Sequence, residues 1–443
     1  MMDSILELIH AKKYHEARKA LIEMNTVDLA ESLIKLPQSD IVKVFRMLPK
    51  DKAAEVFSYL TRDAQKLIID SITDRELSDI MSDLFLDDTV DMIEEMPANV
   101  VKRLLSSADK KKRSLINQFL QYPDHSAGSI MTIEFVDLRK SMTVREAFEH
   151  IRQTGTDKET IYTAYVTDDQ RKLEGVVSIK TLLLADPDER IENLMETQFI
   201  CAHTLDDREE VARLFDRYDL LSIPVVDTEN RLVGIITVDD ILDVLQEETT
   251  EDFARMAAVL PSEKGYLETE ATTHALQRIP WLLFLMMSGL LSGSIIAYYE
   301  DALAVMPILV SFLPMLMDTG GNCGSQSATL MIRGLALQDI QFSDLFLVLW
   351  KELRISIMIG AAMSITIIAI ILLLNQPFVL GLTVGLSLYV TVIVANLIGI
   401  MLPLVAAQMK LDPAIMSSPL ITTIVDAASL IAYFSIARFI LNI

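Results

Sequence analysis

Apolar residues recur at helical spacing through the first 122 residues, separated by short polar connectors. Leu29, Leu33 and Leu36 share one helix face, and the segment LPQSDIVKVFRMLPKDKAAEVFSYL repeats a pattern of helix, polar turn and helix. No stretch shows the convincing alternation of a β-strand. Short helices that repeat in this way stack on one another as a solenoid. We therefore expect residues 1–125 to form a helical N domain.

The pattern changes between Met131 and Leu245, where β-rich and helical pieces alternate and the sequence repeats. Residues Ile161–Leu183 align without gaps with Leu220–Leu242 at an offset of 59 residues. In each copy a strand ends in an Asp-led turn, a second strand follows a glycine, and a helix then begins. The first copy has a connector, Gly155–Glu159, that is longer by five residues. This layout resembles a tandem pair of CBS domains, two β-α-β-β-α modules in one pseudo-twofold unit, which we assign to residues 126–245.

CBS pairs often bind adenine nucleotides, and the resemblance implies which residues would do so here. In the run Gly234–Asp240, Asp240 matches the ribose-contacting acid and Thr237 lies near the phosphates. The first copy has Thr181 in place of that acid, so we expect one competent ATP site at most. A pair that serves only to dimerise the protein is an equally good interpretation.

Long apolar segments dominate the chain from Ala271 onward. Five of them approach the ~20 residues that a helix needs to cross a membrane. They are Ile279–Tyr299, Ala302–Ile332, Ile355–Leu374, Phe378–Leu402 and Ala414–Ile440. We expect a five-helix transmembrane domain in residues 271–443, an interfacial helix in Gly334–Leu353, and a connecting helix in residues 246–270 that joins the CBS pair to the membrane.

The charge is distributed unevenly between these regions. The chain carries a net charge of −23, but six basic and eight acidic residues follow Ala271, so −21 of it lies on residues 1–270. Phosphate binding needs a basic face, which argues against nucleic acid as a partner. With the acidic region in the cytosol, Arg278, Arg333, Lys351, Arg354 and Lys410 fall on the inner side and only Arg438 falls outside. This satisfies the positive-inside rule and predicts an external C-terminus in the cytoplasmic (inner) membrane.

The second apolar segment contains a polar stretch that lipid does not tolerate. Met315–Arg333 reads MLMDTGGNCGSQSATLMIR, with Asp318 followed by glycines, amides and hydroxyl groups. An unsatisfied polar group in hydrocarbon costs several kcal/mol. Glycines let helices approach closely, so a small-residue packing face is one interpretation. A carboxylate with several amide and hydroxyl groups favours an ion pathway.

The fifth segment contains another acid, Asp426, flanked by Thr422, Thr423 and Ser429. A mid-membrane carboxylate costs at least about 2.5 kcal/mol, and no basic residue lies at that depth. Either the acid is protonated and bonded to a threonine, or it faces a cation in water, which we favour. Oxygen ligands suit Mg²⁺, Ca²⁺ or Na⁺ rather than zinc or copper. One carboxylate is a poor site for a divalent ion, so we expect a homodimer with the pore on its twofold axis.

The whole chain resembles the bacterial MgtE-type magnesium channels in domain order and in two membrane motifs. The first motif is Pro314 with DTGGNCGSQ at Asp318–Gln326, and the second runs from Asp412–Pro413 to Asp426. The resemblance implies that Asp426 is the filter acid that binds hydrated Mg²⁺. The candidate pore residues are Asp318, Gly321, Asn322, Gly324, Gln326, Thr422, Thr423 and Asp426.

The resemblance also implies that cytosolic acids sense Mg²⁺. These residues are Glu55, Asp87, Asp88, Asp91, Asp239, Asp240, Asp243, Glu248, Glu251, Asp252 and Asp412. From the residues alone, the acids near Asp87 are better explained as a solvated face. Two positions depart from the family pattern: Ser429 stands where glycine is common, and Gln246 stands where an acid is common.

These observations predict a homodimeric Mg²⁺-selective channel that imports magnesium and that cytosolic Mg²⁺ closes. A secondary-active divalent cation transporter is one alternative, which single-channel currents would distinguish. A membrane-tethered nucleotide sensor without transport is another, which absence of Mg²⁺ flux in proteoliposomes would favour. We expect no enzymatic activity, because the sequence has no phosphate loop, catalytic triad or metal-hydrolase motif.

Overall fold

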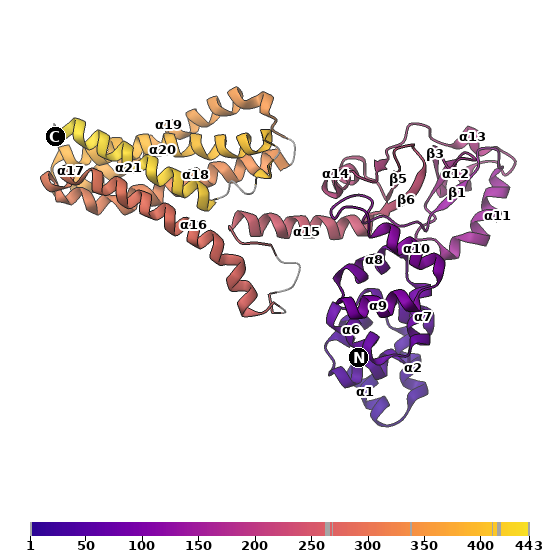
Figure 1. The fold of residues 1–443 in the computed structure, drawn as a ribbon. Helices are drawn as coiled ribbons and strands as arrows, with labels where there is room; N and C mark the ends of the chain where they lie inside the picture. The colour runs from indigo at the N-terminus through magenta and orange to yellow at the C-terminus, as the bar shows by residue number, and fades with distance from the viewer. Residues whose placement is uncertain are drawn as a thin grey trace. The chain divides into compact units, whose positions relative to one another are not determined.

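The structure is a computed structural model that describes residues 2–261, 266–267, 269–336, 339–409, 411–413 and 418–441. Lys410 and Ala414, which entered the predictions above, lie outside these residues. The chain divides into two compact units, one ending at Leu245 and one beginning at Gln246 (Figure 1). Each is described separately below.

The first unit begins with ten short helices, as the apolar spacing predicts. They are α1 (Met2–His10), α2 (Tyr14–Glu23), α3 (Thr26–Ile34), α4 (Gln38–Phe45), α5 (Lys50–Ser58), α6 (Arg62–Ser71), α7 (Asp74–Asp83), α8 (Leu86–Glu95), α9 (Ala98–Ser107) and α10 (Lys110–Phe119). Side chains of Asn25, Thr73 and Asp109 accept hydrogen bonds from the first turns of α3, α7 and α10. Helices two apart in sequence pack together, so that α3, α5, α7 and α9 form one row of a solenoid.

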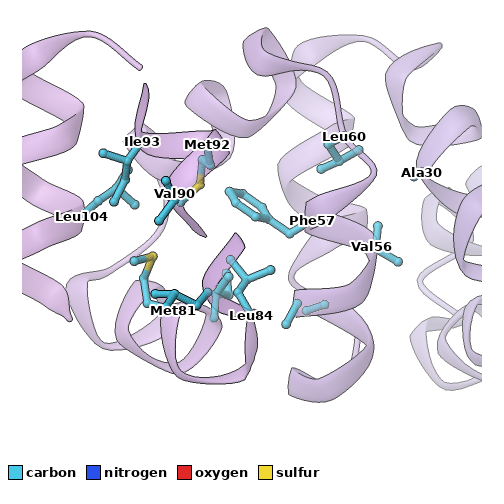
Figure 2. Packing of buried hydrophobic residues seen from close by; sticks show 14 of the residues in the cluster. Ala30, Val56, Phe57, Leu60, Met81, Leu84, Val90, Met92, Ile93 and Leu104 are labelled. Atoms are coloured by element: carbon cyan, nitrogen blue, oxygen red, sulfur yellow. The ribbon is translucent and has the colours of Figure 1, made fainter. Parts of the chain in front are cut away.

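The apolar faces of these helices meet in a continuous core. Figure 2 shows Phe57 of α5 pointing toward Val90 and Met92 of α8, with Met81 and Leu84 close by. These side chains are buried. Burying one such side chain contributes about 1.5–3 kcal/mol. The core extends into the following β-containing region, because Ala127, Met131 and Ile236 belong to the same apolar cluster.

Two three-stranded sheets follow, one in each predicted module. The first contains β1 (Val136–Leu138), β2 (Thr163–Thr167) and β3 (Leu173–Ser178), with helices α11 (Val144–Thr154), α12 (Ile179–Leu184) and α13 (Ile191–Leu194) and a 3-10 turn η1 (Gly155–Asp157). The second contains β4 (Ala202–His203), β5 (Ser222–Val226) and β6 (Leu232–Thr237), with α14 (Arg208–Tyr218) and the start of α15 (Val238–Met256). In both sheets the first strand is parallel to the second and the third is antiparallel.

The two modules are related by the offset of 59 residues that the sequence repeat predicts. Asp168 and Asp227 each accept two backbone N–H groups in the turn between their strands, at 2.8–2.9 Å. The N–H of Leu173 donates to the carbonyl of Asn230, and the equivalent Leu232 donates to the carbonyl of Arg171. Reciprocal bonds of this kind join the modules into one pseudo-twofold body.

Helix α15 is continuous through the boundary between the two units. It begins in the second module at Val238 and ends at Met256, earlier at both ends than the predicted connecting segment 246–270. Ala258 adopts a left-handed conformation with φ 55°, and the N–H of Val259 bonds back to the carbonyl of Ala254. This bond closes the last turn.

The second unit is helical. Its elements are α16 (Ala271–Tyr298), α17 (Glu300–Val305), the 3-10 turn η2 (Pro307–Phe312), α18 (Leu313–Ala336), the 3-10 turn η3 (Phe342–Asp344), α19 (Leu345–Leu373), α20 (Phe378–Gln408) and α21 (Ser418–Leu441). By length and composition, four of the described helices can cross a membrane: α16, α19 with η3, α20 and α21. The remaining long helix, α18, carries the polar stretch. This architecture confirms the predicted fold class of helical N domain, CBS pair and apolar helical region.

Two details of the predicted membrane region are wrong. The segment Ala302–Ile332 is not one helix, because α17 and η2 precede α18. Gly334–Leu353 is not a separate interfacial helix either. Its C-terminal part, which includes Glu352, forms the first turns of α19. The apolar side chains of Leu345, Val348 and Leu349 pack against α18 and α20 there, and this packing extends the helix.

Glycines bring α18, α20 and α21 into close contact (Figure 1). A Cβ added at Gly399 of α20 would lie 2.2 Å from the carbonyl oxygen of Gly324 in α18. One added at Gly321 would lie 2.8 Å from Cγ2 of Thr422 in α21. The helices can therefore approach this closely only where they lack side chains.

Gly399→Ala is expected to destabilise the helical unit, because its Cβ meets backbone that cannot rotate away. Overpacking of this kind costs about 1–3 kcal/mol. The matched control is Gly293→Ala in α16, where no atom of the described chain lies within 4 Å of the added Cβ. Thermal denaturation of the detergent-solubilised protein measures both. Equal midpoints for the two variants would contradict the close crossing.

Candidate functional site

One face of α18 carries polar side chains that no helix in the described part of the chain covers. Asp318, Asn322, Gln326 and Thr329 follow one another at helical spacing and are all exposed. Because α18 lies among helices long and apolar enough to span a membrane, lipid is an unsuitable environment for this face. The face supplies carboxylate, amide and hydroxyl oxygens along one line.

The opposite face of α18 is made of small residues. Gly320 packs near Thr391 of α20 and Val425 of α21, while Gly321 and Gly324 face α21 and α20. The small residues that the first interpretation assigned to helix packing and the polar residues that the second assigned to an ion pathway therefore lie on different faces of α18. Gly321 and Gly324, predicted as pore residues, are buried in helix contacts.

Asp426 lies half-buried on α21, close enough to Asp318 for their carboxylates to interact electrostatically. The hydroxyls of Thr422 and Thr423 both donate to the carbonyl of Pro419, at 2.9 and 3.0 Å. A protonated Asp426 bonded to a threonine is thus not the arrangement seen in the described residues. Two carboxylates near each other are stabilised by a proton on one of them or by a cation between them.

Ser429, one turn after Asp426, is accommodated by a glycine. Its Oγ lies 2.9 Å from the position that a Cβ of Gly320 would occupy, and Ser429 is buried. The serine side chain at position 429, where the family commonly has glycine, therefore fits against α18 because residue 320 of that helix is itself a glycine.

A second acidic site forms in the first unit, where two helix N-termini come together. Asp87 and Asp88 occupy the first turn of α8, and Asp239 and Asp240 occupy the first turn of α15. Helix N-termini favour negative charge, which explains why acids are placed there. The sequence distance between the pairs is about 150 residues, yet each pair affects the titration of the other.

Burial and mutual repulsion raise the pKa values of these acids. Burial, then Asp240 and Asp88, raises the pKa of Asp87, which is only 7% exposed, well above its ordinary value. Burial, then Asp239, raises the pKa of Asp88 to about 6. Burial raises the pKa of Asp240 to about 6, although the hydrogen bonds that it accepts from Thr237 act to lower it. The protein thus holds these carboxylates in a state that needs a cation or a proton.

Sequence analysis missed two members of this cluster. Glu159 follows η1, and burial, then Asp240 and Asp239, raises its pKa to about 8. Glu134, just before β1, repels Asp88 and Glu159. The signal for Glu159 was available, because it ends the five-residue extension that distinguishes the first module from the second. We refer to Asp87, Asp88, Glu134, Glu159, Asp239 and Asp240 as the acidic cluster.

A lysine lies beside the acidic cluster but does not neutralise it. Lys112 of α10 donates to the carbonyl of Leu84 at 2.5 Å, and burial lowers its pKa while Glu134 opposes that shift. Glu55 lies at the edge of the same region. It accepts from Thr26, and after burial the charges of Asp88, Asp239, Glu159 and Glu55 raise the pKa of Tyr59.

The other predicted sensing acids lie further along the same two helices or in the second unit. Asp91 is one turn beyond Asp87, and Asp243 one turn beyond Asp239, both exposed. Glu248 and Asp252 follow on α15. Glu251 and Asp412 are brought together by Arg255, whose guanidinium donates to both carboxylates. Sequence reasoning missed Arg255.

The residues predicted for nucleotide binding bond to each other. The hydroxyl of Thr237 donates to Asp240 at 2.6 Å, in the manner of a helix cap, and Asp240 belongs to the acidic cluster. An open cleft of about 610 Å³ lies instead at the first module, lined by Lys180, Thr181 and Glu189 among others.

No group of three acidic, imidazole or thiol side chains in the described residues has the geometry to ligate a metal directly. Mg²⁺ usually keeps several of its waters, so carboxylates can hold it through water without converging on one point.

Family models match most of the chain, apart mainly from residues 248–312. One described as the MgtE intracellular N domain matches residues 6–125, CBS domain models match 127–188 and 191–247, and a divalent cation transporter model matches 313–436.

Full-length relatives and solved structures agree with these matches. The chain is 39% identical to a magnesium transporter MgtE of Thermus thermophilus over 81% of this chain and 80% of that protein. It is 37% identical to one of Bacillus subtilis, over 84% and 82%. A crystal structure of the cytosolic domain of the Mg²⁺ channel MgtE in complex with ATP matches with a TM-score of 0.52 and 37% identity, over 55% of this chain and all of that one.

The acidic cluster makes a prediction for stability as a function of pH. Folded-state pKa values of about 6 for Asp88 and Asp240 and about 8 for Glu159 exceed the ordinary values of about 4 for unfolded carboxyls. The folded state therefore binds more protons between about pH 4 and pH 8, and its stability falls as the pH rises through that window. Urea unfolding of residues 1–245 without divalent cations measures this.

Glu159→Gln should reduce the loss of stability in the upper part of the window, from about pH 6 to pH 8, because the folded-state pKa of Glu159 is about 8. Glu210→Gln, an exposed acid on α14, serves as the control and should leave the pH dependence unchanged. Stability that is constant or rises from pH 5 to pH 8 would contradict the clustering.

Proposed function

The chain belongs to the MgtE family of magnesium transporters, and on this premise we propose that it is a Mg²⁺ channel of the cytoplasmic membrane that cytosolic Mg²⁺ closes. The observation that carries the proposal is the uncovered polar face of α18 beside Asp426. A transporter of hydrated Mg²⁺ needs oxygen ligands along a water-filled path, and this face offers a line of such oxygens in an otherwise apolar helical unit.

The pore is proposed to form between two copies of the chain. The polar face of α18 is open in a single chain, and a twofold axis beside it would place two copies of Asp318 and Asp426 around one path. Paired carboxylates attract a divalent ion more strongly than one does, while water between them spares the ion full dehydration. In this proposal the C-terminus lies outside and import follows the membrane potential.

Asp426→Asn is expected to abolish most Mg²⁺ uptake into proteoliposomes while the protein still assembles. The amide keeps the size of the side chain but removes the charge that attracts the ion. The control is Asp339→Asn, an exposed acid in the connection between α18 and α19, which should transport normally. Wild-type uptake by Asp426→Asn would contradict its role, and no uptake by the wild type would contradict transport itself.

Closure is proposed to arise from Mg²⁺ binding at the acidic cluster. Without a cation, six carboxylates from the N domain, the connector of the first module and α15 repel one another. Mg²⁺ relieves this repulsion and holds the first turn of α8 to the first turn of α15. Because α15 continues into the second unit, its fixed position offers a route from the cytosolic sites to the pore.

Asp88→Asn combined with Asp239→Asn should make the protein less responsive to Mg²⁺. The change removes both repulsion and ligands, so cleavage between the two units in limited proteolysis should depend less steeply on Mg²⁺ across the millimolar range. A control with the same charge change is Glu210→Gln with Asp216→Asn on α14, two exposed acids outside the cluster. Identical Mg²⁺ profiles for the wild type and the cluster variant would remove the sensing role.

ATP binding is proposed as a secondary property. It is supported by the CBS pair and by the ATP complex of the similar cytosolic domain. Because Thr237 and Asp240 bond to each other, the cleft beside Thr181 in the first module is the better candidate.

A further inference from the structure

A carboxylate of α19 lies against α18, outside both acidic sites. Oε1 of Glu352 accepts a hydrogen bond from the hydroxyl of Ser327 in α18, at 2.6 Å. Ser327 is 6% exposed, and Glu352 is partly buried. The polar face of α18 does not include Ser327, because this residue follows Gln326 and points about 100° away around the helix. Glu352 therefore contacts α18 on a side other than its polar face.

The part of α19 that carries Glu352 is itself fixed to α20. Ser356, one turn after Glu352, donates to the backbone carbonyl of Glu352 at 2.7 Å. The amide of Asn396 in α20 donates to the hydroxyl of Ser356 at 3.0 Å. Both Ser356 and Asn396 are buried. The chain of bonds from Asn396 through Ser356 and Glu352 to Ser327 thus crosses three helices.

This chain of bonds supplies a constraint that the glycine contacts lack. Gly320, Gly321 and Gly324 allow α18 to approach α20 and α21, but they have no side chains that would resist rotation about the helix axis. A charge-assisted hydrogen bond is directional and stronger than a neutral one. The bond to Glu352 is therefore suited to hold α18 at one rotation. That rotation sets where Asn322 and Gln326 point.

We propose that Glu352 is a positioning residue that fixes the rotation of α18 and thereby sets the discrimination between Mg²⁺ and larger divalent cations. The proposal rests on the proposed function, since it assumes that the polar face of α18 lines the ion path. Glu352 does not touch the ion. A rotated face would place the same oxygens at other distances, and Mg²⁺ demands closer control of geometry than Ca²⁺ does.

The test compares Mg²⁺ and Ca²⁺ uptake by full-length protein in liposomes. Glu352→Ala and Ser327→Ala each remove the bond, and each should lower the ratio of Mg²⁺ to Ca²⁺ uptake several-fold. The double variant should be no worse than either single one, because both remove the same interaction. Glu352→Gln keeps an oxygen that can accept from Ser327 and should retain most of the ratio.

Ser364→Ala is the matched control. Ser364 is also a buried serine of a membrane helix, and its hydroxyl donates to the carbonyl of Gly385 at 2.6 Å, joining α19 to α20 without touching α18. Its loss should leave the ratio unchanged. A ratio that falls equally in Ser364→Ala would assign the effect to packing in general and overturn the proposal.

Three other results would also overturn it: an unchanged ratio in Ser327→Ala, effects of the two single variants that multiply, or a loss in Glu352→Gln as large as in Glu352→Ala. Ser327→Ala removes one hydroxyl only, so it tests the bond even where Glu352→Ala does not assemble. Absence of Mg²⁺ uptake by the wild type would be a failure of the proposed function, which the wild-type measurement distinguishes from these outcomes.

Discussion

Electrostatic repulsion between neighbouring carboxylates is a feature that both units of this protein share. Two charges 4 Å apart interact by about 1 kcal/mol in water and by about 4 kcal/mol near a protein surface. The acidic cluster collects its carboxylates from α8, α15 and the loops before β1 and β2, and Lys112, whose pKa burial lowers, lies beside them. Asp318 and Asp426 repeat the situation in the helical unit. A proton or a cation relieves the repulsion between such groups.

On α18, the residues that pack against other helices and the large polar residues lie on separate faces. Its glycine face lets α20 and α21 approach to backbone contact, and its other face keeps every large polar group. A helix that was polar all round would leave groups unsatisfied in lipid, and one that was apolar all round would offer an ion nothing. The low mean hydropathy that keeps α18 from qualifying as a span by composition follows directly from this division.

Sequence reasoning was strong where a pattern repeats and weak where distant segments meet. The 59-residue offset predicted the two modules and even the equivalent turns at Asp168 and Asp227. The periodicity of the first 122 residues predicted the solenoid. The sequence also marked α18 as polar, but not which of its faces would pack. The roles of Glu159, Arg255 and Glu352 were missed because each depends on a partner that lies dozens or hundreds of residues away in the sequence. The periodicity of a single helix or strand does not predict such long-range contacts. The acids near Asp87 were interpreted as a solvated face for the same reason, because the sequence around α8 does not indicate that Asp240 lies close to them.

The chemistry of Mg²⁺ explains why a sensor of this kind would use many weak sites. The ion keeps much of its water, so each bridge contributes little, and no three described side chains converge to ligate it directly. A single weak site would respond gradually over a wide range of concentration. Several sites that all favour one of two arrangements multiply their effects, because their differential binding free energies add on one equilibrium. The steepness of the response is then set by the number of bridged carboxylates and its midpoint by their individual affinity. Residues 1–270 carry a net charge of −21, which would suit a response set by the number of carboxylates. Under the proposed gating, α15 would be the helix that this binding acts on, because it runs without a break from Val238 to Met256.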